Sequence, residues 1–309
     1  MRWWRLPLGV FIVLVIVIWD VGLPGRHTPS TSAAGPSASA APSSGSPSAA
    51  ASSSPPIPGI LQPQGKPEFA ATFDGSKLDT SVWDTCYPGY PGYAGLGPGQ
   101  LGSAGLSQRG CKNLGNNEES EWYLPSQVQV SGGMLHLVAQ REPTEGTTST
   151  GAPKQYECRS GMITSYPGMQ FKYGYIQIVA RIPSDPGLWP ALWLNPANLS
   201  WPPEMDILES WGDGRTAGSY YHPLPTGYPS DKGPITPALR ATGWHTFALS
   251  WTSKKMIFLM DGKVTLTVTT KIPHQKMYFI ADLASYRPVG PANQCSGQML
   301  IKSVEVWKA

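Results

Sequence analysis

Residues 256–268 read M-I-F-L-M-D-G-K-V-T-L-T-V. Two short runs of apolar and β-branched residues flank the pair Asp261-Gly262, and an Asp-Gly pair in this setting favours the tight turn of a β-hairpin. Runs of this length and composition are typical of strands that end at a turn. The stretch therefore predicts a hairpin, with strands over Met256–Met260 and Val264–Val268.

Similar runs continue on both sides of the hairpin, separated by turn residues, and no long stretch shows helical periodicity or an internal repeat. Many short strands within about 240 residues favour a single all-β domain built as a two-sheet sandwich. The other predicted strands are Met134–Gln140, Gly174–Arg181, Leu188–Leu194, Ser219–His222, Trp244–Trp251 and Met277–Leu283.

The N-terminal residues have the pattern of an export signal. Two arginines lie within Met1–Arg5, and Leu6–Trp19 is apolar apart from Pro7 and Gly9. An apolar stretch of this length suits the core of a signal peptide, and an uncleaved anchor that extends past Asp20 is the alternative. Residues 1–27 are therefore predicted to be a signal peptide or a signal anchor, and the protein is expected outside the cytoplasm, secreted or tethered to a membrane.

The next segment is low in complexity. Residues 28–56 are only Ser, Ala, Pro, Gly and Thr. A segment of this kind cannot bury enough apolar area to offset the entropy lost on ordering. Residues 28–65 are therefore predicted to be a disordered linker, and residues 66–309 to form the folded domain.

Charge and histidine content exclude several kinds of partner. The net charge is only +3 at pH 7, and part of it lies in the N-terminal segment. A domain that is almost neutral lacks the field that attracts a phosphate backbone, so no nucleic-acid partner is expected. The five histidines show no metal-ligand spacing, so we expect no catalytic metal and no cofactor.

Four cysteines are present, and none of them forms a C-x-x-C pair. An even number in an exported chain indicates two disulfides, with three connectivities open and reduced thiols as the alternative. We predict Cys86–Cys111 and Cys158–Cys295. The first pair brackets a segment rich in Gly and Pro, which a crosslink would stabilise by restricting the unfolded chain.

One acidic stretch, Glu204-Met-Asp-Ile-Leu-Glu209, carries the chemistry. Side chains alternate between the two faces of a strand, so Glu204 and Asp206 share one face and Glu209 would point to the other. A β-bulge near Ile207-Leu208 adds one residue and returns Glu209 to the face of the first two acids, and bulges often lie beside active sites. The stretch predicts three carboxylates on one face.

Carboxylates this close resist simultaneous ionisation, so one can stay protonated near neutral pH while another is charged. Retaining glycosidases need this division, because one carboxylate attacks the anomeric carbon while a protonated partner delivers a proton to the leaving oxygen. An exposed acidic strand face with no catalytic role is the alternative for this motif.

The neighbouring residues resemble glycoside hydrolase family 16. The segment Gly187–Leu194, G-L-W-P-A-L-W-L, and the segment Trp201–Glu209, W-P-P-E-M-D-I-L-E, resemble two consecutive strands of that family. Further likenesses are the segment Tyr173–Pro183 with its A-R-I, the W-H-T-F segment that starts at Trp244, and the Asp-Gly hairpin. The resemblance spans roughly residues 69–306, and the motifs occur in family order.

This resemblance implies a jelly-roll sandwich with an open concave cleft for a polysaccharide. It also implies retention of configuration, with Glu204 as nucleophile, Asp206 as the assisting acid and Glu209 as the acid/base. The implied substrate contacts are Trp189, Trp193, Trp201, His222, Asn117 and Glu121. A core position for Trp189 and Trp193, a structural role for His222, and a plain loop role for Asn117 and Glu121 are the alternatives.

The chain departs from the family pattern at several positions. Met162 stands where many members have an arginine after S-G, and Asp282–Tyr286 replaces N-L-A-x-G-G. Thr72 and Lys302 stand where many members bind calcium, so no calcium is expected. The bulged motif resembles the β-1,3-glucanase branch more than the mixed-linkage branch. We therefore expect a monomeric endo-hydrolase of β-1,3-glucan, with a transglycosylase or a non-catalytic glycan-binding module as alternatives.

Overall fold

The computed structural model describes residues 60–61, 63–88, 119–147, 152–210, 216–221, 230–232, 243–286, 290 and 293–309. The predicted signal segment and nearly all of the predicted linker lie outside these ranges. In the described part of the chain, helices with the length and hydropathy of a membrane span are absent.

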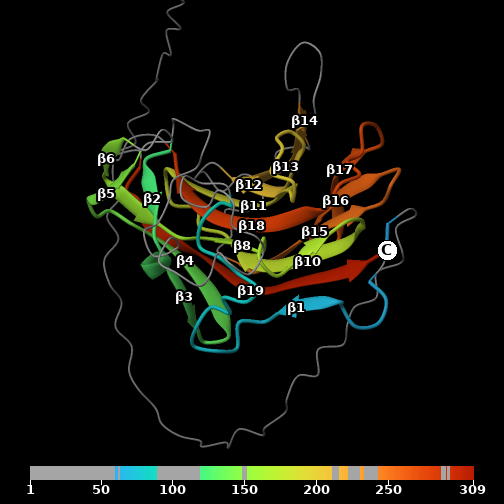
Figure 1. Cartoon of the computed structure of the whole chain (residues 1–309), viewed down its shortest axis with the longest axis horizontal. Helices are drawn as coiled ribbons and strands as arrows, with labels where there is room; N and C mark the ends of the chain where they lie inside the picture. The colour runs from blue at the N-terminus through green and yellow to red at the C-terminus, as the bar shows by residue number, and fades with distance from the viewer. Residues whose placement is uncertain are drawn as a thin grey trace, which may run out of the picture. The chain divides into compact units, whose positions relative to one another are not determined.

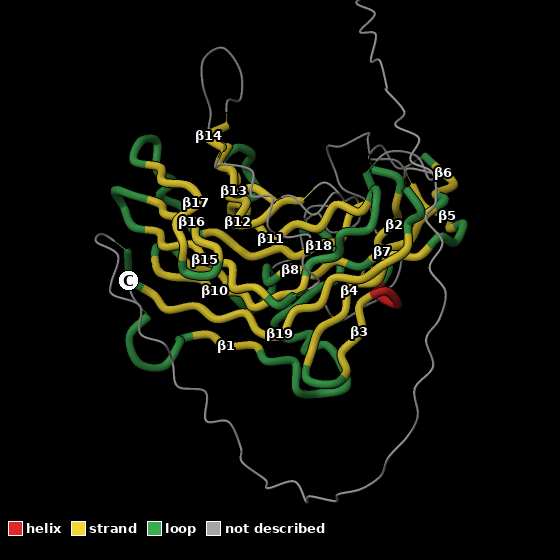
Figure 2. Tube along the Cα trace, turned by 180° about the vertical axis from the view of Figure 1, so that it is seen from behind, coloured by secondary structure: helices red, strands yellow, loops and turns green. Residues whose placement is uncertain are grey.

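Two large sheets, antiparallel except for one pair of strands, lie one above the other (Figures 1 and 2), which confirms the predicted all-β sandwich. The first sheet has ten strands, and β19 lies near its middle and pairs with three of them. Its order is β17 (Lys263–Val268), β16 (Met256–Met260), β15 (His245–Trp251), β10 (Gly174–Arg181), β19 (Ser296–Lys308), β4 (Met134–Gln140), β7 (Cys158–Ser160) and β2 (Glu121–Tyr123), with β1 (Phe69–Ala71) beside β19 and β3 (Val128–Ser131) beside β4.

The second sheet has seven strands and carries the acidic stretch. Its order is β14 (Ser230–Lys232), β13 (Thr216–Tyr221), β12 (Glu204–Ser210), β11 (Leu188–Pro196), β18 (Met277–Ser285) and β8 (Met162–Thr164), with β9 (Gln170–Phe171) beside β18. A small hairpin of β5 (Thr144–Thr147) and β6 (Pro153–Tyr156) and a 3₁₀ turn at Pro125–Gln127 complete the described elements.

Alternate residues of the facing strands form the core between the two sheets. Strand β11 contributes Leu188, Leu192 and Leu194, and β10 of the other sheet contributes Ile176 and Ile178. All five side chains are fully buried. Burial of an aliphatic side chain of this size contributes about 1.5–3 kcal/mol. Trp189, Ala191 and Trp193 take the alternate positions of β11 and point away from the core, and this leaves the outer face of the seven-stranded sheet for the site.

The strands that were predicted match the structure closely, whereas β19, the longest strand, was not among them. The runs Met134–Gln140 and Gly174–Arg181 coincide with β4 and β10. The predicted hairpin is present, and Asp261 and Gly262 have φ angles of 49° and 73°, as a turn with two left-handed residues requires. Strands β11 and β18 each extend two residues further than predicted because they pair with each other over nine residues. Strand β13 begins three residues earlier than the predicted Ser219–His222.

The outer face of the ten-stranded sheet is partly covered by the N-terminal end of the described chain. Ile60 and Leu61 pack against a cluster that includes Tyr175 and Ile257. The backbone N–H of Leu61 also donates a hydrogen bond to Ser250 Oγ at 2.9 Å. The packed part of the chain therefore starts upstream of the predicted boundary at residue 66, because these two apolar side chains find a surface on the sheet.

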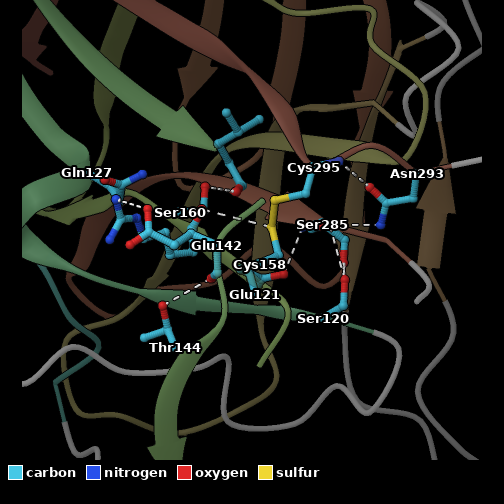
Figure 3. The surroundings of a disulfide bond; sticks show 12 residues. Ser120, Glu121, Gln127, Glu142, Thr144, Cys158, Ser160, Ser285, Asn293 and Cys295 are labelled. Atoms are coloured by element: carbon cyan, nitrogen blue, oxygen red, sulfur yellow. Dashed lines mark hydrogen bonds and ion pairs between the residues drawn. A yellow bond between two sulfur atoms is a disulfide. The ribbon is translucent and has the colours of Figure 1, made fainter. Parts of the chain in front are cut away.

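The predicted disulfide between Cys158 and Cys295 is confirmed (Figure 3), with the two Cα atoms 6.0 Å apart. It joins the first residue of β7 to the residue that precedes β19. Cys111 lies outside the described residues, so its pairing with Cys86 stays a prediction.

Candidate active site

Strand β12 contains the predicted bulge. On one side Leu192 pairs with Leu208 while the next residue, Trp193, pairs with Asp206, so Ile207 is an extra residue. The pairing with β13 shows the same shift, between Asp206 and Glu209. As a result Ile207 and Leu208 both belong to the core. Glu209 thereby returns to the outer face, where Asp206 and Glu204 also lie.

Each of the two glutamates accepts a hydrogen bond from a tryptophan indole. Trp201 Nε1 donates to Glu204 Oε2 at 2.9 Å. Trp189 Nε1 donates to Glu209 Oε1 at 3.1 Å. Glu204 is half-buried and Glu209 is buried. Each indole fixes one oxygen of its carboxyl group and favours the charged form of that group.

Asp206 lies between the glutamates and is buried. Its register partner on β13 is Ser219. The Ser219 hydroxyl donates to Asp206 Oδ2 at 2.9 Å and lies 3.5 Å from Glu209 Oε2. Ser219 is thus in contact with two of the three carboxyl groups, although no motif in the sequence marks it as a site residue.

Burial and mutual repulsion keep protons on this group of acids. Burial is the main cause that raises the pKa of Glu204 to about 7; the indole of Trp201 opposes the rise and the charge of Glu209 adds to it. Burial, followed by the charges of Glu204 and Glu209, raises the pKa of Asp206 well above its usual range. The site therefore holds protons at neutral pH, as acid/base chemistry requires.

The three predicted tryptophans lie on the outer face of the sheet or its rim, outside the core between the sheets. Trp201 is 49% exposed, so its ring can stack on a sugar. Trp189 is half-buried and packs edge-on against Tyr286, with ring centroids 5.5 Å apart. Trp193 is only 9% exposed and belongs to an aromatic cluster on this face, so it offers little area for stacking.

A fourth carboxyl group, Asp282 on β18, extends the site toward β8 and was noted in the sequence only as a departure from the family pattern. Trp193 Nε1 donates to its Oδ1 at 2.7 Å, and the Tyr123 hydroxyl donates to its Oδ2 at 3.2 Å. Its register partner on β8 is Met162, which is fully buried. The apolar side chain of Met162, noted in the sequence as a departure from the family pattern, is therefore opposite Asp282.

Glu121 does not lie where a direct contact with sugar would place it. Its side chain is fully buried, and its Oε2 accepts a hydrogen bond from the backbone N–H of Ser285 at 2.7 Å, as Figure 3 shows. The substrate contact expected for Glu121 is therefore wrong. Strand β2 pairs in parallel with β7, and the hydrogen bond from Ser285 holds the side chain of Glu121 at the end of β18. The other expected contacts, Asn117 and His222, lie outside the described residues.

The raised pKa values predict how stability depends on pH. Burial raises the pKa of Asp282 to about 7 and that of Asp84 to about 6, from 3.8. The folded chain therefore keeps protons that the unfolded chain releases above about pH 4. We expect the free energy of unfolding to fall between about pH 4 and about pH 7, by at most about 1.4 kcal/mol per pH unit and group.

Urea denaturation at a series of pH values within this window measures the slope. Asp282→Asn should make the slope shallower, because the variant has one fewer carboxyl group that binds a proton on folding. A free energy of unfolding that rises with pH across the same window would contradict the assignment.

The sequence profile described as "Glycosyl hydrolases family 16" matches residues 119–288, which is more than half of the chain. The chain belongs to glycoside hydrolase family 16. The match includes β2, the whole acidic strand β12 and Asp282 on β18.

Among curated proteins, the endo-1,3-1,4-β-glycanase ExsH of Rhizobium meliloti (strain 1021) is 30% identical over 182 residues, which are 55% of this chain and 38% of that protein. The chain thus spans about two fifths of the length of this relative. Among solved structures, the laminarinase catalytic domain of Thermotoga maritima MSB8 has a TM-score of 0.61 at 21% identity. The alignment covers 79% of this chain and 98% of the Thermotoga chain. The endo-β-1,3-glucanase of Pyrococcus furiosus has a TM-score of 0.62 at 19% identity, with coverages of 82% and 98%. These structures support the jelly-roll form of the sandwich.

Proposed function

We propose that this family 16 chain is a retaining endo-β-glycanase that cleaves internal linkages of β-1,3-glucan. The observation that carries the proposal is the outer face of β12, where the bulge brings Glu204, Asp206 and Glu209 together. Each glutamate is oriented by a separate indole N–H. Glycoside hydrolysis with retention needs two oriented carboxyl groups, one that attacks as a carboxylate and one that donates a proton.

In the first step an oxygen of the Glu204 carboxylate forms a bond to the anomeric carbon. The glycosidic C–O bond breaks as Glu209 transfers its proton to the departing oxygen. In the second step the Glu209 carboxylate removes a proton from water. The water oxygen bonds to the anomeric carbon while the ester bond to Glu204 breaks, so two inversions give net retention.

Asp206 assists both steps because it is protonated and therefore uncharged. Its burial between two carboxyl groups keeps it neutral, and this reduces the negative charge that the ionised Glu204 would otherwise face. Ser219 holds Asp206 in place with its hydroxyl. A neutral Asp206 therefore lets Glu204 ionise without a further negative charge beside it.

The proposed substrate rests on the bulged motif and on the relatives. Two of the solved structures with this fold are named as a laminarinase and an endo-β-1,3-glucanase, and the curated relative is named as a 1,3-1,4-β-glycanase. The exposed face of Trp201 beside Glu204 suits the apolar face of a neutral sugar ring.

Release of reducing sugar from laminarin, lichenan, agarose and carrageenan, measured side by side, tests this function. We expect the highest rate with laminarin and a proton NMR spectrum in which the β-anomer of the product appears first. Products longer than the substrate in mass spectra would indicate a transglycosylase instead. Binding of laminarin without any change in its length would indicate a non-catalytic binding module.

We also propose that the protein acts outside the cytoplasm, because a basic start, an apolar run and a Ser/Pro-rich segment precede the domain. Cell fractionation with N-terminal sequencing tests this proposal. A mature chain that starts within residues 28–65 would show cleavage and release, and a chain with Met1 in the membrane fraction would show an anchor. Recovery in the cytosolic fraction alone would contradict the proposal.

A further inference from the structure

We propose that Asp282 is a positioning residue, which fixes one wall of the sugar-binding surface beside Glu209 by holding Trp193 and Tyr123 on its two carboxyl oxygens. The inference rests on the proposed function, because it assigns a role to a residue of the same site. It concerns a position where this chain departs from the pattern of its family.

The register of three neighbouring strands places Asp282 in line with Glu209. Asp282 pairs with Ala191 on β11, and Ala191 pairs with Glu209 on β12. Neighbouring strands lie about 4.8 Å apart, so the backbones that carry the two carboxyl groups are separated by about 10 Å. The small side chain of Ala191 lies between them, so both carboxyl groups are on the outer face of the sheet, on either side of Ala191.

The two donors reach Asp282 from different elements. Trp193 comes from β11, within the same sheet, and Tyr123 comes from β2, at the edge of the other sheet. Each donor occupies a different carboxyl oxygen. Two hydrogen bonds to separate oxygens fix the rotation of the carboxyl group as well as the positions of both rings. Asp282 therefore links the two sheets at the side of the site.

The aromatic rings that Asp282 holds also contact one another. Tyr87 lies between them, with its ring centroid 6.1 Å from that of Trp193 and 6.2 Å from that of Tyr123. All three rings are buried or nearly so. The positions of these rings therefore depend on their packing against one another and on the hydrogen bonds that Trp193 and Tyr123 donate to Asp282. Loss of that acceptor would leave an indole N–H and a phenol O–H without their partner in a site with little water.

The charged and titratable groups around Asp282 are acids and phenols. They are Glu121 and Tyr123 from β2, Glu209 and Asp206 from β12, and Tyr87. The β8 position opposite Asp282 is Met162, so the arginine that many relatives have there is missing. Burial together with Glu121 and Glu209 raises the pKa of Asp282 to about 7, against the effect of its two donors. Protonation would turn one of its oxygens from an acceptor into a donor, at the expense of Trp193 or Tyr123.

Steady-state kinetics on the best polysaccharide of the panel tests the role. Asp282→Ala should raise KM about tenfold while kcat stays within about threefold, because the wall of the binding surface moves and the reacting carboxyl groups remain. Asp282→Asn keeps the volume and one acceptor oxygen, so its KM should lie between those of the wild type and Asp282→Ala. Tyr123→Phe should raise KM in the wild type and have almost no further effect on Asp282→Ala.

Binding measurements in a Glu204→Gln background separate the proton on Asp282 from that on the nucleophile. The Kd of a laminarin oligosaccharide should rise as the pH falls through about 7, and Asp282→Asn in the same background should abolish this dependence. Asp84→Asn is the matched control. Asp84 is another buried carboxyl group with a raised pKa, and its carboxylate accepts a hydrogen bond from the backbone N–H of Thr85. This variant should leave KM unchanged.

The outcomes distinguish this proposal from the proposed function. If the wild type acts on a glycan and both Asp282 variants keep its KM and its pH dependence of binding, the positioning role is wrong while the function stands. If Asp282→Ala does not fold, Asp282→Asn and Tyr123→Phe still decide the question. If the wild type neither cleaves nor binds any of the four polysaccharides, both proposals fail.

Discussion

Replacement of Glu204 by alanine is expected to lower kcat on β-1,3-glucan by about 10⁵-fold or more, as for other essential nucleophiles. The variant has no carboxylate to form the glycosyl-enzyme ester. It leaves Trp201 Nε1 without its acceptor and opens a small space beside the anomeric carbon. Azide or formate can enter this space and attack from the same side as the missing carboxylate. The product should therefore be an α-glycosyl adduct from a β-linked substrate.

Proton NMR of the azide adduct measures this outcome, and near-UV circular dichroism checks that the variant is folded. Glu204→Gln is a second variant that keeps the volume and removes only the nucleophile; it should be inactive and should not be rescued, because the amide fills the space. A Glu204→Ala enzyme with turnover close to that of the wild type would contradict the assignment of the nucleophile.

Replacement of Glu209 by alanine should produce a different defect. Polysaccharide hydrolysis should fall by about 10²–10⁴-fold, the usual contribution of a general acid. An aryl glycoside with a good leaving group needs little protonation, so it should still form the glycosyl-enzyme on Glu204. Without a base to activate water this intermediate should accumulate, and a burst of released phenol should precede a slow steady state.

Azide should rescue the Glu209 variant with retention, because it attacks the intermediate from the side that water normally uses. The adduct is then β, opposite to the adduct of the Glu204 variant, and intact-protein mass spectrometry should show the trapped sugar. Identical stereochemistry in the two rescues would mean that the two roles are assigned incorrectly.

Local sequence was enough to predict the all-β class, about half of the strands and the catalytic strand, but not β19, the longest strand. The Asp-Gly turn determines its own hairpin, because the left-handed φ angles it needs are readily adopted by this pair. The bulge at Ile207 was predictable for a similar reason. Three acids and three apolar residues within six positions can be sorted onto two faces only if one residue is added.

The surroundings of the acids could not be predicted, because they depend on pairing between distant strands. Ser219 contacts Asp206 only through the register of β12 and β13, and Asp282 aligns with Glu209 only through two successive registers. Tyr123 reaches Asp282 from the other sheet. Glu121 was misplaced because its burial depends on a hydrogen bond from Ser285, which is distant in sequence and which no short-range pattern indicates.

The attachment of Ile60 and Leu61 to the ten-stranded sheet has a practical consequence for work with this protein. The described chain begins on the outer face of the ten-stranded sheet, and the carboxylates lie on the outer face of the other sheet. An affinity tag, a fluorescent protein or a solid support joined upstream of residue 60 would therefore be attached on the side of the domain opposite to the carboxylates. A long polymer could then lie across the seven-stranded sheet without meeting its point of attachment. Immobilisation through the N-terminal side should therefore leave the face that carries the carboxylates accessible.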